Sequence, residues 1–323
     1  MDFFYFLFPV SGVETYIFIP PLVAMVISFF TSMGGISGAF LLLPFQMSVF
    51  NYTAPSVSGT NHVFNVVAIP SGVYRYIKEG RMAWPLTWVV IVGTLPGVFI
   101  GYYLRVVYLP NPESFKLFVG CVLFYIGIRL LKDTLKKTKH KSLGARALEE
   151  KFKLRADEIK KSQSLKLSAG LPAETVIKII SVSLKRIEYE FWEEKFSFNP
   201  VVIFILALTV GIIGGAYGIG GGAIIAPFCI TVLHLPVYTV AGATLMGTFI
   251  TSVAGAIFFS FIDIPKGVSA MPDWPLGILF GIGGFVGMYF GARFQKFVPQ
   301  KFIKLMLGLV ILFLAVKYIY QYF

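Results

Sequence analysis

The chain has 323 residues, of which 56% are hydrophobic and only 14% are charged, and its formal net charge is +12. So few charged residues exclude a soluble globular protein of this size, because about a quarter or more of such a protein's surface residues are charged. Apolar runs of about 20 residues, long enough to cross a hydrocarbon core of about 30 Å, recur along the chain. They predict an all-α polytopic membrane protein.

Eight apolar segments follow one another in two blocks of four. They lie near residues 15–50, 54–77, 84–105, 114–132, 199–233, 237–262, 275–295 and 302–321. The first segment of each block is interrupted by glycines and a proline, which are costly inside a helix. We therefore expect about eight transmembrane segments in two homologous halves with broken first helices. The parts are a first membrane repeat at 1–132, a linker at 133–198 and a second membrane repeat at 199–323.

The linker is polar and basic, since residues 132–195 hold 16 Lys and Arg against 10 Asp and Glu. A basic excess beside apolar segments is typical of the cytoplasmic face of a plasma-membrane protein and argues against nucleic-acid binding. Ser142–Lys161 has helix-forming composition. The stretch RIEYEFWEEKFSFNP alternates apolar and polar residues, which favours a β-hairpin, with an amphipathic membrane-surface segment as the alternative.

Neither the cysteines nor the N-terminus indicates a secreted or metal-binding protein. Cys121 and Cys229 both lie in apolar segments and form no disulfide framework or metal box. For Cys229 we favour an apolar filler over a reactive thiol. The N-terminus has an acidic residue, Asp2, and no basic flank, so it does not resemble a cleavable signal peptide.

The two blocks repeat one another in their glycines and prolines. At an offset of 183, Gly35, Gly38, Pro44, Gly59 and Gly72 fall on Gly218, Gly221, Pro227, Gly242 and Gly255. At an offset of 190, Trp84-Pro85-Leu86 falls on Trp274-Pro275-Leu276, and Gly93, Gly97 and Gly101 fall on Gly283, Gly287 and Gly291. Internal duplication is typical of secondary transporters. The glycine triplets allow another helix to approach closely, and we favour static packing there over a sliding surface.

The topology depends on whether the broken segments cross the membrane. If each crosses once, the linker, both termini and the Lys78/Arg81 loop share the cytoplasmic side, and the repeats are parallel. If they are re-entrant, the number of crossings changes. Four basic residues within Arg293–Lys304 weaken the charge argument for the first alternative.

The paired breaks are the best candidates for a substrate site. Non-helical backbone at membrane depth is tolerated where it is buried in protein or lines a polar cavity. A helix that begins after a break directs free N–H groups and a partial positive charge into that cavity, which suits an anion. The expected contacts are Gly35, Ser37, Gly38, Gly218, Gly220 and Gly221. The alternative is a glycine kink needed only for packing.

The side chains inside the apolar segments also favour an anionic or neutral substrate. All 16 acidic residues lie outside these segments or at their rims, whereas cation carriers usually need a buried carboxylate. Asn61 and Asn65 fall on Thr244 and Thr248 at the offset of 183, four residues apart and so on one helix face. We expect them to contact the substrate, with interhelical hydrogen bonding as the alternative.

Two basic side chains within the spans have two interpretations each. His62 either carries a coupling proton or packs as a neutral residue, since it lies about 100° round the helix from Asn61. Arg75 lies near the end of its segment, and we favour a snorkelling anchor over an anion gate.

The paired GGISG…P and GIGGG…P segments, followed by SGTN and AGAT, resemble the TauE/SafE family of sulfite exporters. The resemblance covers both membrane blocks. It implies an eight-span secondary carrier, driven by protons or membrane potential, for sulfur-containing anions such as sulfite, sulfoacetate or thiosulfate. Ser37 stands where Gly220 stands in the second block, so the two half-sites are expected to be unequal.

The resulting prediction is a secondary membrane transporter, in the exporting direction, of sulfite or an organosulfonate. An anion channel and a membrane scaffold acting through the linker are the alternatives. The chain has no GxxxxGK[ST] loop and no HExxH motif, so we expect no enzyme activity, cofactor or metal. The expected partners are the anion and the lipid bilayer, and the sequence is compatible with a homo-oligomer.

Overall fold

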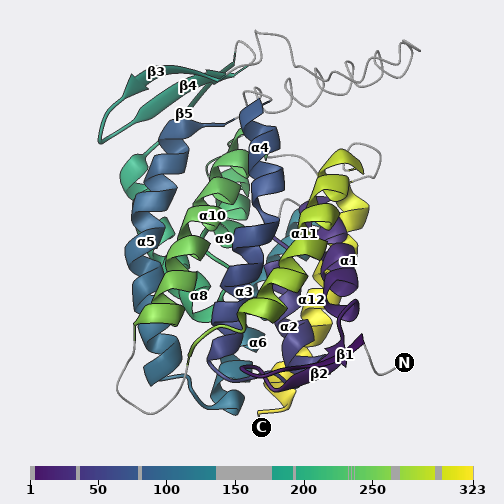
Figure 1. Ribbon diagram of the computed structural model, residues 1–323. Coiled ribbons are helices and arrows are strands. Elements are labelled where there is room, and N and C mark those ends of the chain that lie inside the picture. The colour runs from purple at the N-terminus through teal and green to yellow at the C-terminus, as the bar shows by residue number, and fades with distance from the viewer. Residues whose placement is uncertain are drawn as a thin grey trace, which may run out of the picture.

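The computed structural model describes residues 4–33, 37–78, 82–135, 177–191, 194–231, 233, 235, 237–262, 270–294 and 300–322. In these ranges the chain forms a bundle of helices with a small sheet at each end (Figure 1). We call the end with the chain termini and strands β1 and β2 the terminal end. The end with strands β3 to β5 is the linker end. The predicted Ser142–Lys161 helix lies outside the described residues.

The described part of the first block contains a hairpin and six helices. They are β1 (Tyr5–Phe8), β2 (Val13–Tyr16), α1 (Ile19–Met33), α2 (Ala39–Val49), α3 (Ser56–Ala68), α4 (Pro70–Lys78), α5 (Trp84–Val107) and α6 (Pro112–Leu135). The second block follows a three-stranded sheet. These elements are β3 (Lys178–Val182), β4 (Ile187–Phe191), β5 (Glu194–Phe198), α8 (Pro200–Tyr217), α9 (Gly222–Thr231), α10 (Val237–Phe261), α11 (Trp274–Phe294) and α12 (Gln300–Tyr320).

The helices support a polytopic membrane protein. Among the described residues, five helices (α5, α6, α8, α10 and α11) are long and apolar enough to cross a membrane. Shorter apolar helices occupy 19–33, 39–49 and 305–320. Each of the eight expected segments contains helix, and the first segment of each block is broken as expected.

The described fold is mostly helical, and two small sheets add strands to it. The alternating stretch in the linker forms the antiparallel pair β4–β5, in which Tyr189 faces Phe196, and β3 adds a strand that the pattern did not indicate. The β1–β2 hairpin was not expected either. Its register pairs Tyr5 with Tyr16 and Phe8 with Val13 across a tight turn.

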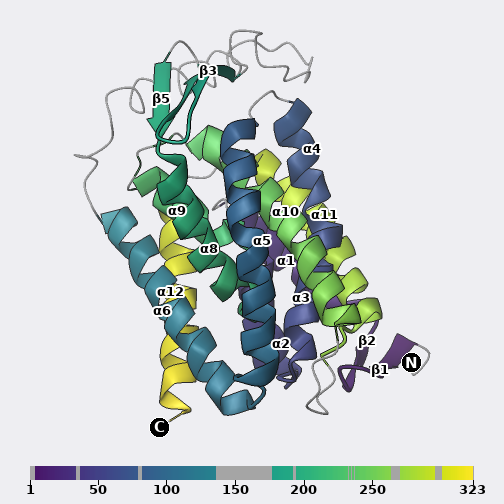
Figure 2. The ribbon, with the colours of Figure 1, turned by 90° about the vertical axis from the view of Figure 1, so that its left-hand side faces the viewer.

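Two pairs of helices pack through glycines in the same way: α1 lies along α11, and α8 lies along α5, each pair running parallel (Figures 1 and 2). The contacts are Gly283 with Pro21, Gly287 with Met25, Gly291 with Phe29, Gly93 with Phe204, Gly97 with Leu208 and Gly101 with Ile212. A Cβ on any of these glycines would lie 1.9–2.9 Å from the partner's carbonyl oxygen, which only glycine avoids. The partner residues are themselves related by the offset of 183, so both interfaces use equivalent positions.

Each broken segment returns to the end at which it starts. The hydroxyl of Ser48, near the end of α2, lies 2.7 Å from that of Tyr318, near the chain's C-terminus. Cys229 of α9 and the following Leu235 pack in one cluster with Tyr189 of β4. With 11 and 10 residues, α2 and α9 are about 15–17 Å long, too short to cross a core of about 30 Å.

This arrangement matches the re-entrant alternative and not the single-crossing one. The chain termini and the β3–β5 sheet lie at opposite ends of the bundle in both ribbon views, whereas single crossings would place them together (Figures 1 and 2). The physical reason is the length of the half-helices, which the hydrophobic pattern alone does not reveal because the apolar run continues through the break.

Candidate functional site

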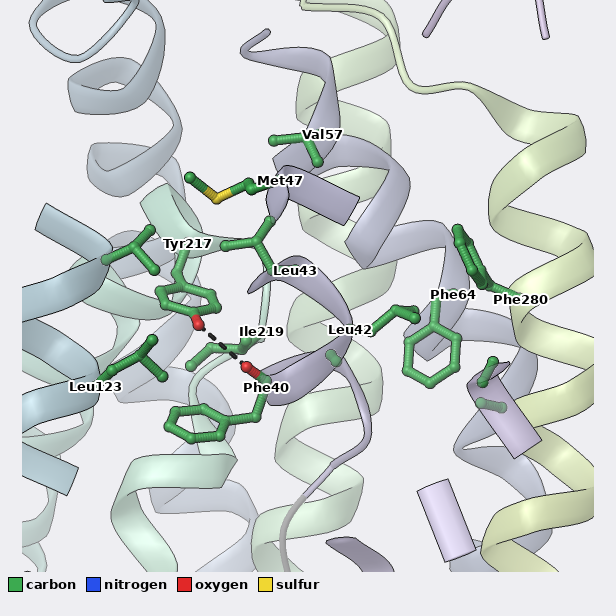
Figure 3. Close-up of a cluster of buried hydrophobic side chains, with 14 of the residues drawn as sticks. Phe40, Leu42, Leu43, Met47, Val57, Phe64, Leu123, Tyr217, Ile219 and Phe280 are labelled. Carbon is green, nitrogen blue, oxygen red and sulfur yellow. Dashed lines mark hydrogen bonds between the residues drawn. The ribbon is translucent and has the colours of Figure 1, made fainter. Parts of the chain in front are cut away.

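The two helix breaks meet in the middle of the bundle. The Tyr217 hydroxyl, at the end of α8, donates a 3.0 Å hydrogen bond to the carbonyl oxygen of Phe40, in the first turn of α2 (Figure 3). The rings of these two residues stack with centroids 6.0 Å apart. Ile219, between α8 and α9, lies beside them (Figure 3). The half-helices α2 and α9 therefore both begin at the centre of the molecule.

The second break depends on glycine backbone geometry. Gly218 and Gly220 have φ values of +87° and +71°, in the left-handed region that side chains disfavour. A Cβ on Gly218 would also lie 2.3 Å from the Ser58 carbonyl oxygen of α3. Gly218 thus ends α8 as its C-cap and lets α3 approach the break.

Asn65 of α3 joins both breaks. The Ser37 hydroxyl donates a 2.6 Å hydrogen bond to Asn65 Oδ1. Asn65 Nδ2 donates to the carbonyl oxygen of Ile219 at 3.2 Å and to the Ser252 hydroxyl of α10 at 3.1 Å. Two residues predicted from separate segments, Ser37 and Asn65, are thereby brought together, and both are buried.

The second break is lined by hydroxyls of α10. The amide of Gly221 donates to Thr251 Oγ1 at 3.3 Å. A Cβ on Gly222, the first residue of α9, would lie 2.3 Å from Thr248 Oγ1 and 1.8 Å from the Thr244 carbonyl oxygen. Thr244 and Thr248 therefore lie against the start of α9. Their own hydroxyls donate to helix carbonyls at Val240 and Thr244, at 3.0 and 2.9 Å.

Asn61 lies on the α2 side of the site. Its Nδ2 donates to the carbonyl oxygen of Ala39 at 3.0 Å, and its Oδ1 accepts from Gln46 Nε2 at 3.5 Å. Asn61 and Thr244 share no hydrogen bond, so the predicted pair is not joined as Ser37 and Asn65 are. In this conformation Asn61 forms hydrogen bonds between α3 and α2, which was the alternative to substrate contact.

Around the first break, buried polar atoms lack partners. Gly38 is the N-cap of α2, and the Ser37 hydroxyl accepts from the amide of Ala39 at 3.3 Å. Ser28 Oγ, on α1, lies so close to Gly38 that a Cβ there would be 2.3 Å away. Ser28 Oγ and Gln46 Oε1 are buried without a hydrogen bond in the described structure. Gly35 lies outside the described residues.

Several polar residues of the site were not predicted. Thr251 and Ser252 extend the face of Thr248 by three and four residues, so helical spacing would have found them. Gln46 lies about two turns into α2, beyond the first break. Thr94 of α5 packs on Gly221, where a Cβ would lie 2.2 Å from Thr94 Cγ2. The sequence around Thr94 contains no motif or spacing that would have indicated a place in the site.

His62 packs against α10 and takes no part in the hydrogen bonds that join the two breaks. Its ring centroid is 5.9 Å from that of Phe259, and a Cβ on Gly255 would lie 2.6 Å from its Nε2. The side chain is fully buried. The carbonyl of Gly215 lies near the ring, but neither ring nitrogen makes a well-formed hydrogen bond to the described residues.

Two buried tyrosines lie outside the membrane helices. Burial raises the pKa of Tyr52, at the terminal end, although its hydroxyl pairs with Thr60 Oγ1 at 3.0 Å. Burial likewise raises the pKa of Tyr189, at the linker end, whose hydroxyl pairs with Thr239 Oγ1 at 2.9 Å. Both phenols stay neutral at physiological pH and act through hydrogen bonds.

The described part of the site contains no cluster that would bind a metal. Among the described residues, no three His, Cys, Asp or Glu side chains come together. Cys229 is buried in the apolar cluster under the β4–β5 hairpin, which agrees with its interpretation as a filler. The side chain of Arg75 lies outside the described structure.

Comparison with known proteins agrees with this architecture. A family model described as "Sulfite exporter TauE/SafE" matches residues 21–318. The probable membrane transporter protein YunE of Bacillus subtilis (strain 168) is 20% identical over 302 residues, which cover 90% of this chain and 92% of YunE. The probable membrane transporter protein YdhB of the same organism is 31% identical over 101 residues, or 31% of this chain and 38% of YdhB. No solved structure matches. Because the family model extends across both helical blocks, the chain belongs to the TauE/SafE sulfite exporter family of membrane transporters.

Proposed function

We propose that this protein is a secondary transporter that exports a small sulfur-containing anion, such as sulfite or an organosulfonate, and binds it where the two helix breaks meet. The observation that carries the proposal is the Asn65 bridge. One fully buried carboxamide contacts Ser37 of the first break and Ile219 of the second. The site therefore includes both halves of the molecule, as alternating access requires.

The electrostatics of the site favour an oxyanion. Two half-helices, α2 and α9, begin there, and helix N-termini carry a partial positive charge and unpaired N–H groups. Hydroxyl and amide groups surround these termini, at Ser37, Asn65, Thr248 and Thr251. Every acidic residue of the chain lies outside the apolar segments or at their rims. A desolvated anion there meets donors and no carboxylate.

We infer that the two blocks are inverted repeats. The broken helix of each block packs on the glycine triplet of the other, at positions related by the two sequence offsets. The broken segment of the first block starts and ends at the terminal end, and that of the second block starts and ends at the linker end. Rocking between these equivalent arrangements would expose the site to one side and then the other.

Three further predicted residues, Asn61, Thr244 and Thr248, must change their present hydrogen bonds before they can bind the anion. For Asn61 to donate to an anion, its Nδ2 must leave the carbonyl oxygen of Ala39. Thr244 and Thr248 must likewise turn their hydroxyls away from the carbonyls of their own helix. Backbone amides near Gly38, Gly220 and Gly221 supply the other donors. His62 is the candidate for proton coupling.

We place the protein in the plasma membrane with the linker end in the cytoplasm. The basic excess of residues 132–195 supports this orientation. The two blocks then contact lipid through exposed apolar side chains such as Phe99, Ile282 and Phe313.

The test is flux in proteoliposomes that contain the purified protein. Sulfite, thiosulfate, sulfoacetate, sulfate and chloride are offered in turn, with and without a pH gradient. We expect saturable flux of a sulfur oxyanion. Flux that rises linearly with concentration would indicate a channel instead. Folded protein that moves none of these anions would disprove the carrier proposal, and a deletion within residues 141–195 would then test the linker as a scaffold.

A further inference from the structure

Arg105 is a fully buried cation at the terminal end of the bundle. It lies in the last turn of α5, and its side chain has no exposed surface. Nε donates to Ser58 Oγ at 3.3 Å, Nη2 donates to the carbonyl oxygen of Thr53 at 2.9 Å, and Nη1 donates to the carbonyl oxygen of Leu109. The guanidinium also stacks on Phe115, with Cζ 3.6 Å from the ring centroid.

The charge of Arg105 has no acidic partner in the described structure. Its three hydrogen-bond acceptors are all neutral. The nearby buried carboxylate, Asp273, instead accepts hydrogen bonds from the backbone and hydroxyl of Ser11 and from the amide of Leu276. A guanidinium carries five N–H donors, so two remain beyond the three in use. An uncompensated buried charge is costly, and inside membrane proteins such residues mark ion pathways.

Arg105 is connected to the central site through one face of α3. Ser58 accepts from Arg105 and donates in turn to the carbonyl oxygen of Ala216, at the end of α8. Ser58, Asn61 and Asn65 follow at intervals of three and four residues, so they lie along one side of the helix. From Ser58 to Asn65 the helix rises about 10 Å. A row of polar groups thus leads from Arg105 to the Asn65 bridge.

We propose that Arg105 forms a second anion subsite, on the path between the central site and the terminal end. This inference rests on the proposed transport of an oxyanion. The two remaining N–H groups and the positive charge of the guanidinium bind the oxyanion as it enters or leaves, in the paired geometry that suits a sulfonate or sulfite. The neutral acceptors Thr53 and Leu109 hold the guanidinium in place when no anion is there.

The test compares Arg105→Gln and Arg105→Lys with the wild type in right-side-out and inverted membrane vesicles. A matched control is Lys116→Gln, which removes a cation near the start of α6 at the same end and leaves the three hydrogen-bond acceptors of Arg105 in place. The terminal end is located by labelling Val10→Cys, in the β1–β2 turn, with a membrane-impermeant maleimide in a Cys121→Ser background. Initial rates of sulfite flux then give KM and the maximal rate from each side.

We expect Arg105→Gln to raise KM about ten- to hundredfold for sulfite offered at the terminal end, as the loss of a charge-assisted hydrogen bond implies. The KM from the linker end should change less than about twofold, Arg105→Lys should be intermediate, and Lys116→Gln should match the wild type. An unchanged KM at the terminal end would overturn the proposal. An equal loss from both sides together with a lower Tm would also overturn it, since it would indicate a structural role alone. A wild type without flux would instead refute the transport function itself.

Discussion

Ser37 donates a 2.6 Å hydrogen bond to Asn65 Oδ1, while the Nδ2 of the same carboxamide donates to the carbonyl oxygen of Ile219. One side chain on an intact helix thus holds two helix breaks that are far apart in the sequence. The contact gives the site its position, because the starts of α2 and α9 are both tied to α3. It also makes Asn65 the most informative residue for mutation.

Replacing Asn65 with leucine should impair both transport and stability. The change leaves the Ser37 hydroxyl, the Ile219 carbonyl and the Ser252 hydroxyl without their shared partner, at about 1–3 kcal/mol for each buried group that stays unpaired. We expect sulfite flux to fall at least about tenfold and the Tm to drop. Ser252→Ala removes only one of these contacts and should cost less. Wild-type flux in Asn65→Leu would show that the bridge is not part of the site.

Gly218→Ala should destabilise the protein for two separable reasons. The new side chain is strained at a φ of +87°, and its Cβ would lie 2.3 Å from the Ser58 carbonyl oxygen. Gly12→Ala is a matched control, because Gly12 has a φ of +67° but no atom within 4 Å of its Cβ position. Strain alone costs on the order of 1 kcal/mol. We therefore expect a clear loss of Tm and flux for Gly218→Ala and a small one for Gly12→Ala. Equal losses would mean that the approach of α3 is unimportant.

Gly97→Ala and Gly287→Ala should lower the stability of the protein by similar amounts. A Cβ would lie 2.4 Å from the Leu208 carbonyl oxygen in the first case and 2.2 Å from the Met25 carbonyl oxygen in the second. Each change forces two parallel helices apart, and we expect each to lower the free energy of unfolding by about 1–3 kcal/mol, as overpacking does. Thermal unfolding in detergent measures both.

Gly247→Ala is the control for that pair, because its Cβ would meet only side-chain atoms of Val90 and no backbone atom. Its Tm should stay closer to the wild type. A large loss in one variant of the pair and none in the other would argue against equivalent interfaces in the two blocks.

His62→Gln should separate proton coupling from packing. The imidazole is fully buried and makes no well-formed hydrogen bond in the described structure, so a proton taken up there would change the local electrostatics strongly. We expect the variant to keep sulfite flux at a fixed pH and to lose the stimulation by a pH gradient. His62→Phe serves as the packing control beside Phe259. A gradient response that survives in both variants would leave His62 as a packing residue.

The sequence by itself determined the class of protein, the location of the breaks and the register of the two blocks. These are local or additive properties: apolar length defines the segments, and glycine and proline interrupt helices wherever they occur. The register was informative enough to anticipate Gly93 and Gly283 as equivalent packing positions, while the assignment of Ser37 and Asn65 to a substrate site stays a prediction. The alternation in the linker predicted the β4–β5 hairpin for the same local reason.

Only the tertiary structure decided which way the chain runs after each break and which polar side chains meet. The half-helices turn back because they are too short to cross, although the apolar run that contains them is long enough. Asn61 contacts α2 while Asn65 joins both breaks, and Arg105 is buried rather than exposed at the membrane surface. Helix direction, rotation and burial depend on contacts between segments that are 22 to 154 residues apart in these examples, and no local pattern encodes them.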